Sequence, residues 1–395
     1  MGLTRSAILL LLLTCGCATR SPESLCVLAP AAIPESWRPS GEVHKSLSAA
    51  PWSADEAKVA AYAVKRGLDE LSDLFSSRPT TVRALADDAV EPLIDASYAA
   101  ANMPALQIAA RDQARRVLTL LLAPYLRRSS DSPTCNEFSH LVTLTIYSQA
   151  LLPSGDARTR LMVALTNGAY QACGSFPAAI GYDYHRTLAG ENVSTNDIWN
   201  LVMWSITLTD AQLVPGLELP PEARDLPPAL WHFLAHYSLA GARAYPDGAL
   251  DKRFYDTAYL ATHIAYIPTG YGRHPIYIAD APDLYRFLRQ NFYAVLEMGE
   301  LDLVAEFVDL FRQYGCTEQN DLQVRDGTRY LLKLFHSAGD HWMAYRERYE
   351  PAKTSDYDAV HKAWTGMSGV RVRVPEPAKL GTYGGIVRGW LGYPR

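Results

Sequence analysis

From about residue 51 onward the chain carries a helical pattern almost throughout, and this pattern limits the folds open to it more than any other feature. Ser53-Ala-Asp-Glu56 has the form of a capping box, and Ser194-Thr-Asn-Asp opens another helix. Alternating runs typical of strands are scarce, with Ile276-Tyr-Ile-Ala the main one. The sequence therefore predicts an all-α fold of about twelve helices, over residues 53–77, 79–101, 104–127, 134–152, 155–173, 194–212, 221–243, 251–267, 281–298, 300–314, 319–337 and 355–367.

The predicted helices follow one another through short breaks such as Pro153-Ser-Gly-Asp156. Helices in tightly linked pairs favour an α/α toroid over residues 51–370, with an inner and an outer ring. A helical-repeat superhelix is the alternative, although the chain shows no fixed-period consensus of the tetratricopeptide type. Residues 371–395 hold several Gly and Pro residues without a helical period, so we expect a tail or a strap over the surface.

Composition excludes some classes of partner. Hydrophobic residues make up 48% of the chain and charged residues 20%, which is typical of a folded globular protein. The formal net charge is −5 and no basic cluster occurs, so nucleic acid is not expected as a partner.

The chain begins with a short segment of the secretory type. Arg5 precedes an apolar run over residues 7–13, which is far too short to span a bilayer. The run ends in Leu13-Thr-Cys-Gly-Cys17, which resembles the lipobox of bacterial lipoproteins, with cleavage after Gly16. The resemblance implies a lipoprotein signal peptide over residues 1–16.

The same resemblance implies a lipid on Cys17 and a place in the bacterial cell envelope, with the lipid as the membrane anchor. Ala18 stands where some enteric lipoproteins have Asp, and by that analogy it favours the outer membrane, facing the periplasm or the surface. Residues 17–50 are rich in Pro, Ser and Ala, a composition that suits an extended tether between lipid and fold.

Four cysteines follow the lipobox: Cys26, Cys135, Cys173 and Cys316. An exported chain with an even number of cysteines is expected to form disulfides, and four cysteines allow three connectivities. Cys135 and Cys173 lie near opposite ends of a predicted helical hairpin, which favours a bond between them.

One passage, over residues 327–342, bears on the fold class. Gly327, the pair Tyr330-Leu331, Gly339 and Trp342 follow a pattern that resembles a degenerate QW-type repeat of terpenoid cyclases and prenyltransferase-like toroids. The resemblance supports a toroid fold. The DxDD and DDxxD motifs of terpene chemistry are absent, so that activity is not implied.

The strongest candidate for chemistry is the predicted helix over residues 251–267. Asp256, Tyr259, His263 and Tyr266 follow at three-four-three spacing and share one face. A polar, aromatic stripe on an otherwise apolar helix suits the inner wall of a binding cavity, with His263 as a general base. The alternative is that Asp256 and His263 satisfy each other inside a helical core.

The segment after this helix adds Tyr271, Arg273 and His274 to the candidate site. Gly270 and Gly272 let the backbone turn tightly there. Arg273 is expected to clamp a carboxylate or phosphate in a forked pair, with His274 as a second candidate base. The alternative reading makes Arg273 a surface charge.

A metal site is a further hypothesis. His232 and His236 are four residues apart on one predicted helix face, a spacing that suits two ligands of one divalent metal ion, zinc or iron. Phe233 stands where a zincin has its Glu, so protease chemistry is excluded. A third ligand would come from elsewhere, such as His185, Asp256 or His263. The alternative is packing in an aromatic seam.

A last group joins His336, Asp340, His341 and Trp342 with His361 on the final predicted helix. Of these, Trp342 and His361 are candidates for ligand binding. Capping and packing are the alternative roles for the group.

The chain holds 23 Tyr and 8 Trp, whose faces suit stacking on sugars. Gly-x-Ser-x-Gly, HExxH, the P-loop and GxGxxG are all missing, which argues against serine hydrolases, zincins and nucleotide enzymes. The first hypothesis is therefore an envelope enzyme using His/Tyr acid–base chemistry on a carbohydrate or other polyhydroxylated ligand. A non-catalytic scaffold or accessory lipoprotein with an envelope protein partner is the second, and a metal-binding protein is the third.

Overall fold

The computed structural model describes residues 50–100, 103–128, 132–191, 194–234, 237–239, 241, 252–346, 355–371 and 382–391. Within these ranges every regular element is a helix, so the all-α prediction is confirmed. The α-helices are α2 (Ala54–Ser77), α3 (Pro79–Leu85), α4 (Glu91–Ala99), α5 (Pro104–Leu126), α6 (Phe138–Leu151), α7 (Ala157–Cys173), α8 (Phe176–Ile180), α9 (Tyr184–Leu188), α10 (Thr195–Ala211), α11 (Pro221–Leu234), α12 (Lys252–Thr269), α13 (Pro282–Met298), α14 (Leu301–Gln313), α15 (Leu322–Ser337), α16 (Asp356–Val370) and α17 (Tyr383–Trp390). Three short 3₁₀ helices join them: η4 (Ala86–Ala89), η5 (Cys135–Glu137) and η7 (Ile278–Asp280).

The helix starts follow local sequence signals. Ser53 and Ser194 both close capping boxes, in which each side chain accepts a hydrogen bond from the backbone three residues on. The single helix predicted over 79–101 is wrong, because the chain forms α3, η4 and α4 there. Ala86 takes a positive φ of 55°, which ends α3, and Pro92 sits in the first turn of α4.

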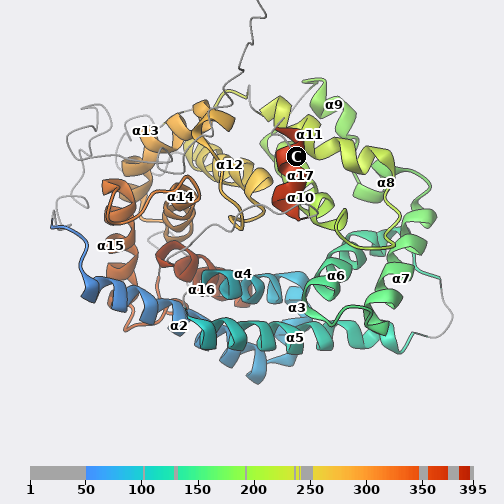
Figure 1. Ribbon diagram of the computed structural model, residues 1–395, viewed down its shortest axis with the longest axis horizontal. Coiled ribbons are helices and arrows are strands. Elements are labelled where there is room, and N and C mark those ends of the chain that lie inside the picture. Colours follow the sequence, from blue (N-terminus) through green and yellow to red (C-terminus); the bar gives the residue numbers. More distant parts are fainter. Residues whose placement is uncertain are drawn as a thin grey trace, which may run out of the picture.

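The longer helices form two layers around a centre (Figure 1). The inner layer holds α4, α6, α10, α12, α14 and α16, and the outer layer holds α2, α5, α7, α11, α13 and α15. Along the inner layer α6 contacts α10, α10 contacts α12, α12 contacts α14, and α14 contacts α16. Helix α16 also packs on α2 and α4, so the last inner helix lies against the first ones. The inner layer thus places side chains from distant parts of the sequence around one centre.

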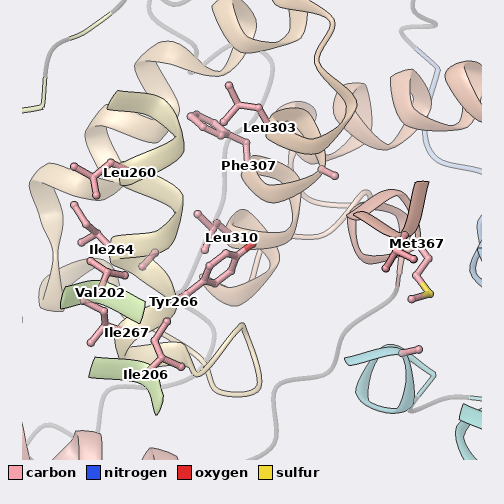
Figure 2. Packing of buried hydrophobic residues seen from close by; sticks show 14 of the residues in the cluster. Val202, Ile206, Leu260, Ile264, Tyr266, Ile267, Leu303, Phe307, Leu310 and Met367 are labelled. Atoms are coloured by element: carbon pink, nitrogen blue, oxygen red, sulfur yellow. The ribbon is translucent and has the colours of Figure 1, made fainter. Parts of the chain in front are cut away.

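Small residues let the inner helices approach closely. A Cβ atom at Gly369 of α16 would lie 2.7 Å from the Cβ of Ala305 on α14, so only glycine permits this contact. Elsewhere the inner layer packs through aliphatic and aromatic side chains. Figure 2 shows this packing between α10, α12 and α14, with the buried residues Val202, Ile206, Leu260, Ile264, Ile267, Leu303, Phe307 and Leu310.

The predicted C-terminal tail needs a correction. Residues 382–391 contain α17, which contacts α10 and α12, and Tyr383 is buried with its hydroxyl donating to the carbonyl of Ile267. Arg371, placed in the tail by the sequence analysis, is 1% exposed and belongs to the inner layer. With three glycines and a buried tyrosine, α17 packs closely on its neighbours, which the weak helical period of this segment did not indicate.

Cys135, at the start of η5, and Cys173, at the end of α7, are joined by the disulfide that their spacing favoured. The signal peptide, Cys17 and the tether over 17–50 lie outside the described residues, apart from Ala50. Among the helices that the structure describes, none is both long and apolar enough to cross a membrane.

Candidate functional site

A cavity of about 210 Å³ lies where the inner helices meet. Its wall comes from η4, α4, α10, α12, α14 and α16, together with the segment after α12. Two kinds of side chain dominate. The aromatic ones are Trp199, Tyr259, Tyr266, Tyr271, Tyr357 and Trp364, and the carboxyl groups are Asp88, Glu91, Asp95, Glu306 and Asp309.

Three members of the predicted stripe on α12 line this cavity. Tyr259, His263 and Tyr266 all contribute to its wall. The ring centroids of Tyr259 and Tyr266 each lie 5.4 Å from that of His263, and Trp199 of α10 lies 4.0 Å from His263. Helical spacing therefore identified one wall of the cavity correctly.

Asp256, the fourth member of the stripe, is not in the cavity. Its carboxylate pairs with Lys252, at 2.7 Å, on an exposed part of the same helix. Asp256 lies near the start of α12, beyond the end of the cavity, so the common face continues into solvent. The role in catalysis that we expected for Asp256 is therefore not supported by its position.

His263 is buried and neutral. Its Nδ1 donates to the carbonyl oxygen of Tyr259, at 3.1 Å, and also lies 3.6 Å from the carboxylate of Glu306. Burial and, to a smaller extent, the charge of the nearby His361 lower the pKa of His263 to about 3. A group with this pKa is a weak base at neutral pH, so His263 does not suit the general-base role that the sequence suggested.

Tyr271 enters the cavity wall through an unusual backbone. Its φ is 54°, and the neighbouring Gly270 and Gly272 also have positive φ values of 56° and 72°. A left-handed tyrosine costs conformational energy, and such residues persist where the surroundings hold them. The Tyr271 hydroxyl donates to the sulfur of Met203, at 3.4 Å. The two predicted glycines thus turn the chain so that Tyr271 points inward.

Arg273 does not reach this cavity. It pairs with Asp210 at 2.6 Å, donates to the carbonyl of Gly270 and lies over the ring of Tyr383, at 5.1 Å from its centroid. Its positive charge is therefore matched by protein groups, and the expected clamp on a carboxylate or phosphate is not formed. His274 stacks on Tyr383, with 5.6 Å between the two ring centroids. Like Arg273, it lies outside the cavity wall.

Arg371 is the centre of the charge network that the sequence analysis missed. Its guanidinium lies 2.7 Å from Asp95 of α4 and binds both carboxylate oxygens of Asp309 on α14, each at 3.1 Å. Burial alone would lower the pKa of Arg371, but the two carboxylates raise it above its ordinary value. Trp364 and Ser368 of α16 also donate to Asp95, at 3.1 Å and 2.8 Å.

Asp88 and Glu91 form a pair of acids on the wall whose pKa values are both raised. Burial raises the pKa of Glu91 to about 8, and the negative charges of Asp87 and Asp88 add to the effect. Burial also raises the pKa of Asp88 to about 6, together with the charge of Asp87. Glu91 accepts a hydrogen bond from the hydroxyl of Tyr147, at 3.2 Å. At neutral pH Glu91 is therefore protonated while most Asp88 is ionised.

Glu306 is a second acid whose protonated form is favoured by its surroundings. Burial raises its pKa well above the ordinary value, and the charge of Asp302 adds to this effect. The hydroxyl of Thr262 donates to its carboxyl group. His361, a predicted binding residue, lines the cavity nearby and lies 3.4 Å from the carboxylate of Asp302.

Trp342, the other predicted binding residue, lies in the core. Its side chain is fully buried and donates to the carbonyl of Ala63, at 2.9 Å, while its ring covers Gly366. The pattern that suggested a toroid repeat thus marks a packing residue, and Trp342 has no access to the cavity.

The structure describes one of the two histidines of the predicted metal pair. His232 is exposed on α11, and His236 lies outside the described residues. Among the residues that the structure describes, no group of three or more His, Cys, Asp or Glu side chains is placed to hold a metal ion.

The cavity carboxyls carried a signal that sequence reasoning passed over. Asp88, Glu91 and Asp95 follow at three- and four-residue spacing, the same pattern that drew attention to α12. Comparison with protein families, curated proteins and solved structures gave no match for this chain. The function is therefore argued from the geometry of the cavity.

Proposed function

We propose that the two-layer ring is an α/α toroid whose central cavity binds a small polyhydroxylated ligand, such as the end of a glycan, and hydrolyses its glycosidic bond. The observation that carries this proposal is the pair Asp88 and Glu91, two carboxyl groups three residues apart on one cavity wall. Burial raises the pKa of Asp88 to about 6 and that of Glu91 to about 8. Paired carboxyl groups in different protonation states are the means by which glycosidases act.

The protonation states assign the roles. Glu91 is protonated at neutral pH and donates its proton to the leaving oxygen as the bond to the sugar breaks. Asp88 is mostly ionised and accepts a proton from the attacking water, whose oxygen forms the new bond. Acid–base catalysis is therefore assigned to two carboxyl groups of η4 and α4, in place of the histidine and tyrosine of our first hypothesis.

The rest of the wall supports binding. Burial raises the pKa of Tyr266 and Tyr271 well above 10, so both hydroxyls stay neutral and serve as hydrogen-bonding groups. Trp199 and Trp364 provide apolar faces on which a sugar ring can stack. A volume of about 210 Å³ is below the range of about 300–1,000 Å³ for drug-sized ligands, which favours one sugar unit at a time.

The test uses the full-length chain and a panel of chromogenic aryl glycosides. We expect one or more to be hydrolysed, with a rate that rises through pH 6 as Asp88 ionises and falls through pH 8 as Glu91 loses its proton. Glu91→Gln and Asp88→Asn should each lower the rate at least about a hundredfold. Glu191→Gln, which changes an exposed carboxyl far from the cavity wall, is the matched control. Hydrolysis that survives in both cavity variants would contradict the proposal.

We also propose that the protein is a lipoprotein of the bacterial envelope, held by a lipid on Cys17 and facing the periplasm or the surface. The lipobox-like Leu13-Thr-Cys-Gly-Cys17 supports this proposal. Metabolic labelling with a palmitate analogue should mark the wild-type chain but not Cys17→Ser. Equal labelling of both chains would refute the assignment of the lipid to Cys17.

A further inference from the structure

The charges on the cavity wall are unequal in sign at neutral pH. Of the five carboxyl groups that line it, Glu91 is protonated and burial favours the protonated form of Glu306. This leaves Asp88, Asp95 and Asp309 against Arg371, the one lysine or arginine among the described lining residues. The guanidinium of Arg371 is already shared between Asp95 and Asp309. No guanidinium or ammonium on the described wall is therefore left to receive a negatively charged ligand.

Asp88 differs from the other carboxyl groups of this wall. In the part of the chain that the structure describes, it makes no hydrogen bond and no ion pair within 4 Å, and the charge of the nearby His361 lowers its pKa less than burial raises it. Glu91, Asp95, Glu306 and Asp309 each have a hydrogen bond or an ion pair. Desolvating a carboxylate is costly, so a ligand that brings a positive charge to Asp88 gains a closer pairing than His361 supplies.

Aromatic side chains near the entrance of the cavity also suit a positively charged ligand. Tyr357 of α16 lines the cavity while 47% exposed, which places it at the opening. Its ring stacks on that of His361, with 5.4 Å between the centroids. Trp364, about one helical turn after His361, lines the same wall. A cation held over tyrosine or tryptophan is attracted by the ring, and the attraction grows as water is excluded.

The following inference rests on the proposed function and adds the chemistry of the ligand. We infer that the sugar bound in this cavity carries an amine, so that its ammonium group pairs with Asp88 beside the rings of Tyr357 and Trp364. A sugar with a carboxylate in the same place would face an excess of negative charge, and like charges brought together lower affinity. The site therefore selects amino sugars over uronic acids.

The experiment compares three disaccharides of similar size by calorimetric titration at pH 7. They are β-1,4-linked glucosamine, its N-acetylated counterpart and digalacturonate. The full-length Glu91→Gln chain is used, because Gln keeps the neutral state of Glu91 and prevents turnover. We expect the glucosamine disaccharide to bind at least about tenfold more tightly than the N-acetylated one, and digalacturonate not to bind.

Two further variants in the same background locate the ammonium group. Asp88→Asn should remove the preference for the amine, and Asp256→Asn, which changes a carboxylate outside the cavity, should keep it. If the N-acetylated sugar or digalacturonate binds as tightly as the amine, and Trp199→Ala abolishes that binding, the inference fails and the glycan-binding proposal stands. If none of the three sugars binds, both fail.

Discussion

The raised pKa of Glu91 predicts that the free energy of unfolding depends on pH. Its pKa is about 8 in the folded protein, against an ordinary value of 4.5 that it takes in the unfolded chain. Below pH 4.5 the group is protonated in both states. Between pH 4.5 and about 8 the unfolded chain releases its proton while the folded protein keeps it, so stability falls as the pH rises. At about 1.36 kcal/mol per pH unit, the free energy of unfolding falls by about 5 kcal/mol in total over this range.

Glu91→Gln removes this dependence, because glutamine does not titrate. The free energy of unfolding of the variant, relative to wild type, is therefore expected to rise by about 5 kcal/mol between pH 4 and pH 8.5. Urea denaturation followed by circular dichroism at several pH values measures it, with Glu191→Gln as the control that should follow the wild-type curve. A difference that stays constant to within about 1 kcal/mol across this range would refute the reasoning, since Glu91 would then be ionised in the folded protein.

Two other substitutions test the core and the charge network. Trp342→Ala removes a fully buried side chain and its hydrogen bond, and should lower the free energy of unfolding by about 3–5 kcal/mol in the same assay; a loss under about 1 kcal/mol would contradict the packing role. Arg371→Met leaves two buried carboxylates without their cation and should cost about 3–5 kcal/mol at pH 8, and less at pH 5 where they can take up protons. Arg388→Met, at an exposed site on α17, is its control, and equal losses in the two variants would speak against the network.

Local signals in the sequence accounted for most of the helices. The capping boxes at Ser53 and Ser194 begin helices where they were expected, because a cap depends only on residues three apart. The interruption at Ala86 was missed, because alanine rarely takes a positive φ and its presence in the sequence does not indicate one. The helix α17 was missed for a different reason, as its Gly-rich segment is helical through packing on α10 and α12.

The residues of the candidate site were predicted where local spacing identifies them, and missed where their role depends on how helices pack. Tyr259, His263 and Tyr266 were found because they share one face of one helix, which spacing reveals. The partners of Arg371 lie on other helices, and an acidic helix face looks the same in a sequence whether it meets water or a cavity. Arg273 was misjudged for this reason too, because its pairing with Asp210 depends on how α10 and α12 pack.

The contact between the first and last inner helices also has a consequence for how the protein is made. Arg371 contacts Asp95, 276 positions earlier in the chain, so the two ends of the inner layer meet only after nearly the whole polypeptide has been synthesised. Contacts of such long range are slow to form, and an unfinished chain would expose the apolar sides of α4 and α14 until α16 arrives. The ring of inner helices is therefore expected to stay open until late in synthesis, when α16 completes it.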